Sequence, residues 1–540
     1  MGRMTSRIMT SDQLSIGTDL IPVVDLTITR YGYYQLVESL RMDRVMDNYD
    51  QLMDHQEFIR QLINSPQRVN QLSQLLHLIH EREPDVEWLE ADMDEQTKRF
   101  YPPVGFLNHP KILYGYNQLM VYGFTLTLVL HLINMLVLKL YVGVPNTMAE
   151  YVDKTISQLR RFAEGGVGMV IRNRRVVSLV GMVLVNSYII FQLFQLGTGF
   201  FAAWNHRIGM GMFRDRYRRL KQLINLIGKL RSVIDINHQI SDQFYVLRKY
   251  INQSTSFGQE LISRTNQHLF RDSLRDCLQF IGEVDLLVNS ARLVLYHDYS
   301  IPEFVQSDTP ALKITDLYHP KLSIDSVTND VEFHPDERVM VITGGNGAGK
   351  STLMRSVMIS TIMAQTMGVV PAKRMRLTPF THLSVYLNIP DAVGKQSLYE
   401  AELDNCLDHL NCVQRLPSHR FGLSIIDELF TGTNPVDGIS GSIAVVESLG
   451  GCKNCYHIVS THFHQLCELG RKKSTFVNKQ FRIEYGSDGR IIPNYRLCNG
   501  VSDQNIGVSL MKQRGFSQQV VEQAEKVAQR IRIDYTGSET

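Results

Sequence analysis

The feature that most constrains the fold is an apolar strand that runs directly into a glycine-rich loop. The strand is Val339–Ile342, and the loop that follows reads Gly344-Gly345-Asn346-Gly347-Ala348-Gly349-Lys350-Ser351-Thr352. This is a complete GxxxxGK[ST] phosphate-binding loop in the strand–loop–helix setting that the motif requires. Backbone N–H groups of such a loop turn toward phosphates, and the helix that follows adds its positive end. The loop therefore predicts an α/β domain that binds a nucleoside triphosphate, with Lys350 on the β- and γ-phosphates and Ser351 on Mg²⁺.

A second strand ends in two carboxylates. Leu423–Ile426 is apolar and is followed by Asp427 and Glu428. Downstream of a phosphate-binding loop, this pattern predicts Asp427 as a Mg²⁺ ligand, direct or through water. It predicts Glu428 as the group that polarises the attacking water.

A third strand ends in a histidine. His457–Ser460 is followed by Thr461 and His462, and a histidine in this order suits a hydrogen bond to the phosphate that leaves. Lys350, Glu428 and His462 are thus the predicted catalytic residues of a Mg²⁺-dependent ATPase.

The rest of the chain divides by its apolar pattern. A chain of 540 residues suggests three or four domains. Apolar residues at three- and four-residue spacing predict long helices before the α/β part, whereas short β-branched runs that alternate with helical segments predict a mostly parallel sheet. The predicted division is a polar tail (1–25), helices (26–110), an uncharged hairpin (111–205), helices (206–305), the ATPase domain (306–515), and a helical segment with a tail (516–540).

Two long uncharged stretches mark the hairpin. Residues 112–138 and 176–205 contain no Asp, Glu, Lys or Arg, and each exceeds the roughly 20 residues that cross a bilayer. Two alternatives are open: a membrane-spanning hairpin, or a water-excluded hairpin packed inside protein. The positive-inside rule does not decide between them, because the intervening loop and the outer flanks are both basic. The length of the stretches favours the membrane.

Composition excludes some classes of protein. With 44% hydrophobic and 20% charged residues, the chain is globular rather than disordered. Its net charge of +2 means that a DNA surface must come from local clustering, and Arg214–Arg231 is either such a surface or a solvated or membrane-flanking helix face. Seven cysteines are too few for a disulfide framework. Cys452 and Cys455 are half of a zinc site or, as we favour, reduced thiols. The first 48 residues lack the apolar core of a signal peptide.

Several motifs resemble those of the MutS family of DNA mismatch repair ATPases. An ABC transporter or SMC-type ATPase would have an LSGGQ-like signature before Asp427, and none is present. The similar segments are Thr343–Arg355 (P-loop), Asp427–Asn434 (Walker B and D-loop), Thr461–Leu466 (His-loop), Gln396–Glu402 (signature), Leu317–Pro320, Gly282–Val288 and Gly500–Val508. The resemblance implies an ABC-type ATPase domain preceded by an all-α lever domain. It also implies ATP and Mg²⁺ as cofactors, DNA as a partner, and a homodimer or MutS-like heterodimer in which Ser397 reaches the partner's nucleotide. Residues 516–540 would supply a dimerisation motif.

The resemblance has limits along the chain. It is strong over about 270–533, weaker over 25–110 and 206–270, and absent over 111–205, where the family has its DNA clamp. No segment resembles the family's mismatch-reading domain, with its Phe-x-Glu motif, or its connector domain. Gly345 stands where the family usually has Pro, and Lys373 where it has Gln. Neither change removes a phosphate or magnesium contact, so activity is expected.

Two functions remain open from the sequence. The first is an ATP-dependent DNA-binding protein that acts in mismatch repair or on mismatched or branched DNA, inside the cell where DNA lies. The alternative is a membrane-anchored MutS-like ATPase with a role other than mismatch recognition. A non-catalytic scaffold is disfavoured, because Lys350, Ser351, Asp427, Glu428 and His462 are all present.

Overall fold

The computed structural model describes most of the chain outside its centre. The described residues are 14–41, 45–84, 218–234, 268–322, 326–386, 398–485, 491–502 and 507–536, with isolated positions between 129 and 248. They belong to two compact units, residues 1–80 with 279–540 and residues 81–278. The first unit, which we call the P-loop unit, carries every described candidate residue of the phosphate-binding site.

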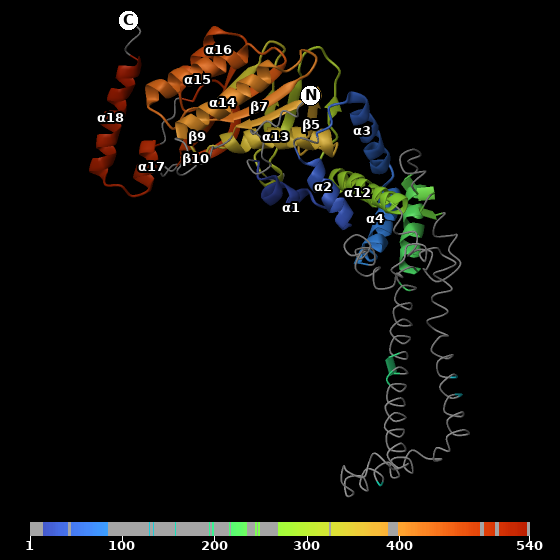
Figure 1. Ribbon diagram of the computed structural model, residues 1–540. Helices are drawn as coiled ribbons and strands as arrows, with labels where there is room; N and C mark the ends of the chain where they lie inside the picture. Colours follow the sequence, from blue (N-terminus) through green and yellow to red (C-terminus); the bar gives the residue numbers. More distant parts are fainter. Residues whose placement is uncertain are drawn as a thin grey trace, which may run out of the picture. The chain divides into compact units, whose positions relative to one another are not determined.

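A six-stranded sheet forms the centre of the P-loop unit (Figure 1). All pairs are parallel except β10–β9, which is antiparallel. Parallel strands covered on both faces have continuous apolar runs, and every residue of β4, β7 and β8 is buried. In sheet order the strands are β10 (Ile491–Asn499), β9 (Phe476–Tyr485), β4 (Val339–Thr343), β8 (Cys455–Ser460), β7 (Gly422–Asp427) and β6 (His382–Tyr386).

Helices cover the sheet. Val339 and Val341 of β4 share a buried cluster with Val446 and Leu449 of α15 (Pro435–Gly450) and with residues of α14 (Leu398–Gln414). The phosphate-loop helix α13 (Lys350–Thr366) is buried on nearly all sides. Figure 1 shows it on the side of the sheet toward the N-terminal helices. The predicted α/β fold is confirmed for this part of the chain.

A smaller sheet and short helices complete the unit. The small sheet has the order β1-β5-β2-β3. Its strands are β1 (Glu303–Phe304), β5 (Arg374–Leu377), β2 (Leu312–Leu317) and β3 (Asn329–Glu332). The remaining short or C-terminal elements are η5 (Pro320–Leu322), η6 (His464–Cys467), α16 (Glu468–Lys472), α17 (Gly507–Gln513) and α18 (Gln518–Thr536). A helix was predicted near the position of α18.

The N-terminal helices are bound to one long helix by polar contacts. Asp285 accepts hydrogen bonds from the backbone N–H and the hydroxyl of Thr29, both at 2.7 Å, and Thr29 caps the next helix through Gly32 N. Burial raises the pKa of Asp285 to about 6. A Cβ at Gly32 would lie 2.1 Å from Asp285 Oδ2, so this close approach requires glycine. The helices are η1 (Ile16–Leu20), α1 (Ile21–Val24), α2 (Arg30–Ser39), α3 (Tyr49–Ile63), α4 (Pro66–His80) and α12 (His268–Tyr296).

Little of the second unit is described. Residues 218–234 form an amphipathic helix that buries Leu220, Leu223, Ile227 and Leu230. Within the described part of the basic stretch, the exposed cations are Arg218, Arg219, Lys221 and Lys229. This charged face matches the sequence pattern.

The predicted uncharged hairpin lies outside the described residues. Only isolated positions of residues 111–205 are described, so the hairpin and the division into lever limbs stay predictions. No helix in the described ranges is both long and apolar enough to cross a membrane.

Candidate functional site

The phosphate-binding loop leaves β4 at the edge where the parallel strands end. Its backbone turns at Gly347, with φ of 77°, and at Gly349, with φ of 107°. Residues that have a side chain rarely adopt this left-handed backbone region, so glycine is required at both positions. Gly349 then caps α13, which begins at Lys350. The strand–loop–helix prediction is confirmed, and the positive end of α13 lies at the loop.

Lys350 lies inside the loop that precedes it. Its side chain is buried, and Nζ donates to the carbonyl oxygens of Gly344 at 2.9 Å and Gly345 at 3.4 Å. Burial lowers the pKa of Lys350, while the carboxylates of Glu428 and Asp427 oppose that shift. The ammonium group therefore lies within the loop, and the charges of both carboxylates act on it.

Asp427 is the last residue of β7 and is buried. It pairs in register with Ser460 of β8, whose hydroxyl donates to Asp427 Oδ1. Ser351 lies in the first turn of α13. Carboxylate and hydroxyl oxygens are the hard ligands that Mg²⁺ prefers, so this donor set fits the predicted ion.

Glu428 follows Asp427 with an unusual backbone. Its φ is 56°, and its N–H donates to Ser460 O at 3.2 Å. His462 Nε2 donates to Glu428 Oε1 at 2.9 Å. This hydrogen bond, aided by the charges of His462 and Lys350, lowers the pKa of Glu428 against the effect of burial. Both side chains stay partly exposed, at 34% for Glu428 and 41% for His462. The structure therefore presents Glu428 as an ionised carboxylate that water can reach.

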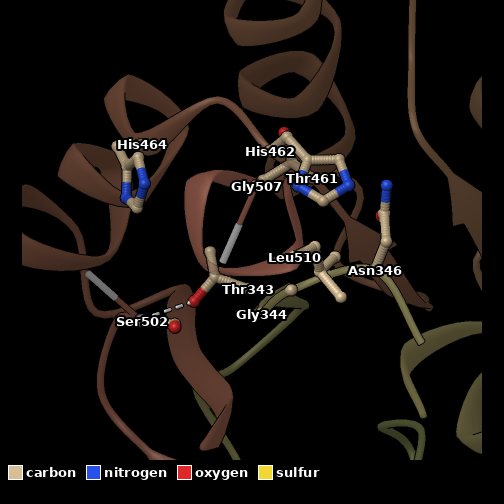
Figure 2. Close-up of a pocket in the computed structure, with 10 residues that line it drawn as sticks. Thr343, Gly344, Asn346, Thr461, His462, His464, Ser502, Gly507 and Leu510 are labelled. Atoms are coloured by element: carbon tan, nitrogen blue, oxygen red, sulfur yellow. Dashed lines mark hydrogen bonds between the residues drawn. The ribbon is translucent and has the colours of Figure 1, made fainter. Parts of the chain in front are cut away.

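A pocket of about 250 Å³ adjoins the loop (Figure 2). The loop contributes Gly344, Gly345 and Asn346, and the segment after β8 contributes Thr461, His462 and His464. Residues from the C-terminal segment close it: Ser502, Gly507 and Leu510. Ser502 N donates to Thr343 Oγ1 at 2.8 Å, which joins this segment to the end of β4. His464, which had no predicted role, thus lies at the site, whereas His457 is fully buried in the sheet.

Tyr495 is a neighbour of the loop that the sequence did not indicate. A Cβ placed on Gly349 would lie 3.3 Å from Tyr495 Cδ1, and the tyrosine is 45% exposed. Its φ is 54°, at an irregularity where the β9–β10 register shifts between Pro493 and Leu497. Asn329 fixes this irregularity, since its side chain donates to Tyr495 O at 3.0 Å and accepts from Leu497 N at 2.7 Å. A tyrosine in a hairpin carries no sequence signal of such a position.

Two sequence predictions lie at the limits of the described residues. Ser397 is outside them, and α14 begins at the next residue, so its role stays a prediction. Cys452 and Cys455 are free thiols. Across the described ranges, no group of three or more His, Cys, Asp or Glu residues could hold a metal ion. The zinc interpretation has no support there.

This fold and loop define a P-loop protein of the α/β class. Residues 340–532 match the family model of MutS domain V. This match, with the relatives described below, supports a MutS-family protein.

Three similar proteins are named DNA mismatch repair protein MutS. The Ehrlichia ruminantium (strain Gardel) protein is 25% identical over 357 residues, or 59% of this chain and 43% of that protein. The Myxococcus xanthus protein is 30% identical over 267 residues, or 48% of this chain and 29% of that protein. The Persephonella marina protein is 26% identical over 326 residues, or 58% of this chain and 35% of that protein. The matched region is therefore less than half the length of each relative.

Proposed function

We propose that this chain binds ATP and hydrolyses it with Mg²⁺, and that the cycle controls its binding to mismatched or branched DNA. The observation that carries the hydrolytic part is the convergence of Lys350, Asp427 and Glu428 at the loop. Both carboxylates oppose the effect of burial on the Lys350 pKa without cancelling it, and His462 Nε2 donates a hydrogen bond to Glu428 Oε1 at 2.9 Å.

Each residue at the loop has a distinct role. The backbone N–H groups of Gly344–Ser351 bind the phosphates. Lys350 exchanges its contacts with the Gly344 and Gly345 carbonyls for contacts with phosphate oxygens. Ser351 and Asp427 hold Mg²⁺, which neutralises phosphate charge when it is bound. Thr352 completes the loop at the start of α13.

Glu428 is the general base in this proposal. Its lowered pKa keeps it ionised at neutral pH, so it can accept the proton of the attacking water. His462 orients the carboxylate through its Nε2 hydrogen bond, and it lines the pocket beside Asn346, where the terminal phosphate would lie.

Tyr495 supplies a surface for the base. An exposed aromatic ring next to Gly349 can stack on a purine, and stacking tolerates small changes in the base because it uses the ring face. The Asn329 side chain donates to Tyr495 O and accepts from Leu497 N, so it fixes the backbone from which the ring projects.

DNA binding rests on the family and on charge. The relatives are named DNA mismatch repair proteins, and the 218–234 helix exposes a cationic face that suits a phosphate backbone. Ser397 is proposed to contact the nucleotide of a partner subunit, in a homodimer or a MutS-like heterodimer. That arrangement would make two shared ATPase sites.

Binding measurements with defined DNA test the proposal. Fluorescence anisotropy would compare matched duplex, mismatched duplex and four-way junction, each with and without ATP and Mg²⁺. We expect tighter binding to a mismatched or branched DNA and an ATP effect that disappears in Lys350→Ala. Lys221→Gln should reduce the salt slope by about one, while Lys313→Gln, an exposed lysine of the other unit, should not. Equal affinity for all three DNAs, unchanged by ATP, would contradict the DNA role.

A further inference from the structure

Glu402 is a buried carboxylate in the second turn of α14, away from the phosphate-binding loop. It is 4% exposed. Its Oε1 accepts from Thr431 N at 3.3 Å and from Thr431 Oγ1 at 3.1 Å, and its Oε2 accepts from Gly432 N at 3.3 Å. Both carboxylate oxygens are therefore bonded to one short turn.

That turn directly follows Glu428. The backbone has φ of 56° at both Glu428 and Phe430. Residues other than glycine adopt this region at an energetic cost, and surrounding contacts must hold them there. The direction in which the Glu428 side chain leaves the backbone thus depends on what holds residues 429–432.

Two helices hold the turn from different sides. From α14, Tyr399 packs edge-to-face on Phe430 with ring centroids 5.9 Å apart. A Cβ on Gly432 would lie 3.0 Å from Leu398 Cγ, so the turn and the start of α14 are in close contact. From α15, Ser442 Oγ donates to Leu429 O at 3.1 Å. Glu402 supplies the charged contact among these.

We propose that Glu402 is a positioning residue for ATP hydrolysis, which sets the orientation of Glu428 through the Thr431–Gly432 backbone. A buried carboxylate without donors is costly, so it favours the turn geometry that supplies Thr431 N, Thr431 Oγ1 and Gly432 N. That geometry is the one in which Glu428 meets His462. Glu402 contacts neither nucleotide nor metal ligands in this role. The inference rests on the proposed ATPase function.

Glu402→Gln is the direct test, because it keeps the side-chain size. In glutamine, an NH2 group replaces one of the two carboxylate oxygens, and this group cannot accept a hydrogen bond. At least one of the N–H and O–H groups of the turn therefore loses its acceptor. We expect kcat for ATP to fall about tenfold or more, while KM changes by less than about twofold. Asp408→Asn is the matched control, since it makes the same change at an exposed position of α14 and should leave both constants unchanged.

Thr431→Val provides a second, milder variant. It removes only the hydroxyl contact to Glu402 and should lower kcat by a smaller factor. In the double variant the two effects should not multiply, because both act through one contact. A folded Glu402→Gln protein with wild-type kcat overturns the inference. A change in KM alone, with kcat unaltered, also overturns it. So do effects on kcat that multiply in the double variant. If the wild-type protein does not hydrolyse ATP, the proposed function fails and this inference fails with it.

Discussion

Replacing His409 with Asn should make the folding stability of the P-loop unit less sensitive to acid. Three histidines lie within the sheet and α14: His382, His409 and His457. His409 is hydrogen-bonded to Ser384 Oγ at 2.8 Å and His457 to Ser424 Oγ at 2.6 Å. The Nε2 atoms of all three histidines are buried without a hydrogen-bond partner. Such groups are stable only while they are neutral.

The magnitude follows from the pKa of His409. Burial, with a smaller effect of His382, lowers this pKa from 6.5 to about 3. A lowered histidine pKa means that stability is complete above pH 6.5 and is lost as the pH falls toward 3, because the unfolded chain takes up the proton first. At pH 5 the native ring is still neutral, and the loss is about 2 kcal/mol, from ~1.5 pH units at ~1.4 kcal/mol each. His457, whose pKa is also lowered by burial, adds to the loss.

Hydrogen exchange of β7 and β8 amides, corrected for intrinsic rates, measures this stability in the P-loop unit. Asn can keep a polar atom near Ser384 and does not titrate. When the pH falls from 8 to 5, the free energy of unfolding should decrease by about 2 kcal/mol less in His409→Asn than in the wild type. The exposed His77 of α4 gives the control. In His77→Asn, the free energy of unfolding should decrease over this pH range by as much as in the wild type. An identical loss in His409→Asn and wild type would refute the reasoning.

Three further predictions concern the nucleotide site. Tyr495→Ala should weaken ATP binding about tenfold by equilibrium titration, since stacking contributes ~1–3 kcal/mol, and Tyr495→Phe should bind like the wild type. His462→Ala removes the hydrogen bond that lowers the Glu428 pKa, so the acid limb of the pH profile of kcat should move to higher pH. An unmoved acid limb would show that His462 does not set the protonation of Glu428. Mixing Lys350→Ala with Ser397→Ala protein should restore some activity through hybrids that hold one intact site, and no rescue in proven heterodimers would rule out shared sites.

Local pattern was enough to predict the loop and the polar residues at the ends of the neighbouring strands. The loop, Asp427, Glu428 and His462 each follow a buried strand, and parallel strands place their carboxyl ends at one edge of the sheet. The order of motifs along the chain therefore predicted that they meet at that edge, and the hydrogen bond from His462 Nε2 to Glu428 Oε1 at 2.9 Å joins two of them.

Residues that act through tertiary contacts were not predicted. Tyr495 reaches Gly349 only because the β9–β10 register shifts and Asn329, far away in sequence, fixes the shift. The sequence placed Glu402 in the signature segment Gln396–Glu402, but its contact with Thr431 arises from the packing of α14. His457 looks like a surface or packing residue in sequence, and only the sheet shows that it is fully buried.

The most direct test of the central claim is ATP hydrolysis by Glu428→Gln, measured beside ATP binding. The amide keeps the size of the side chain and removes the base. Hydrolysis should fall by on the order of 10²-fold or more, while Mg²⁺-dependent ATP binding through Lys350 and the loop persists. Wild-type hydrolysis by the folded Glu428→Gln protein would contradict the claim that Glu428 activates water at this site.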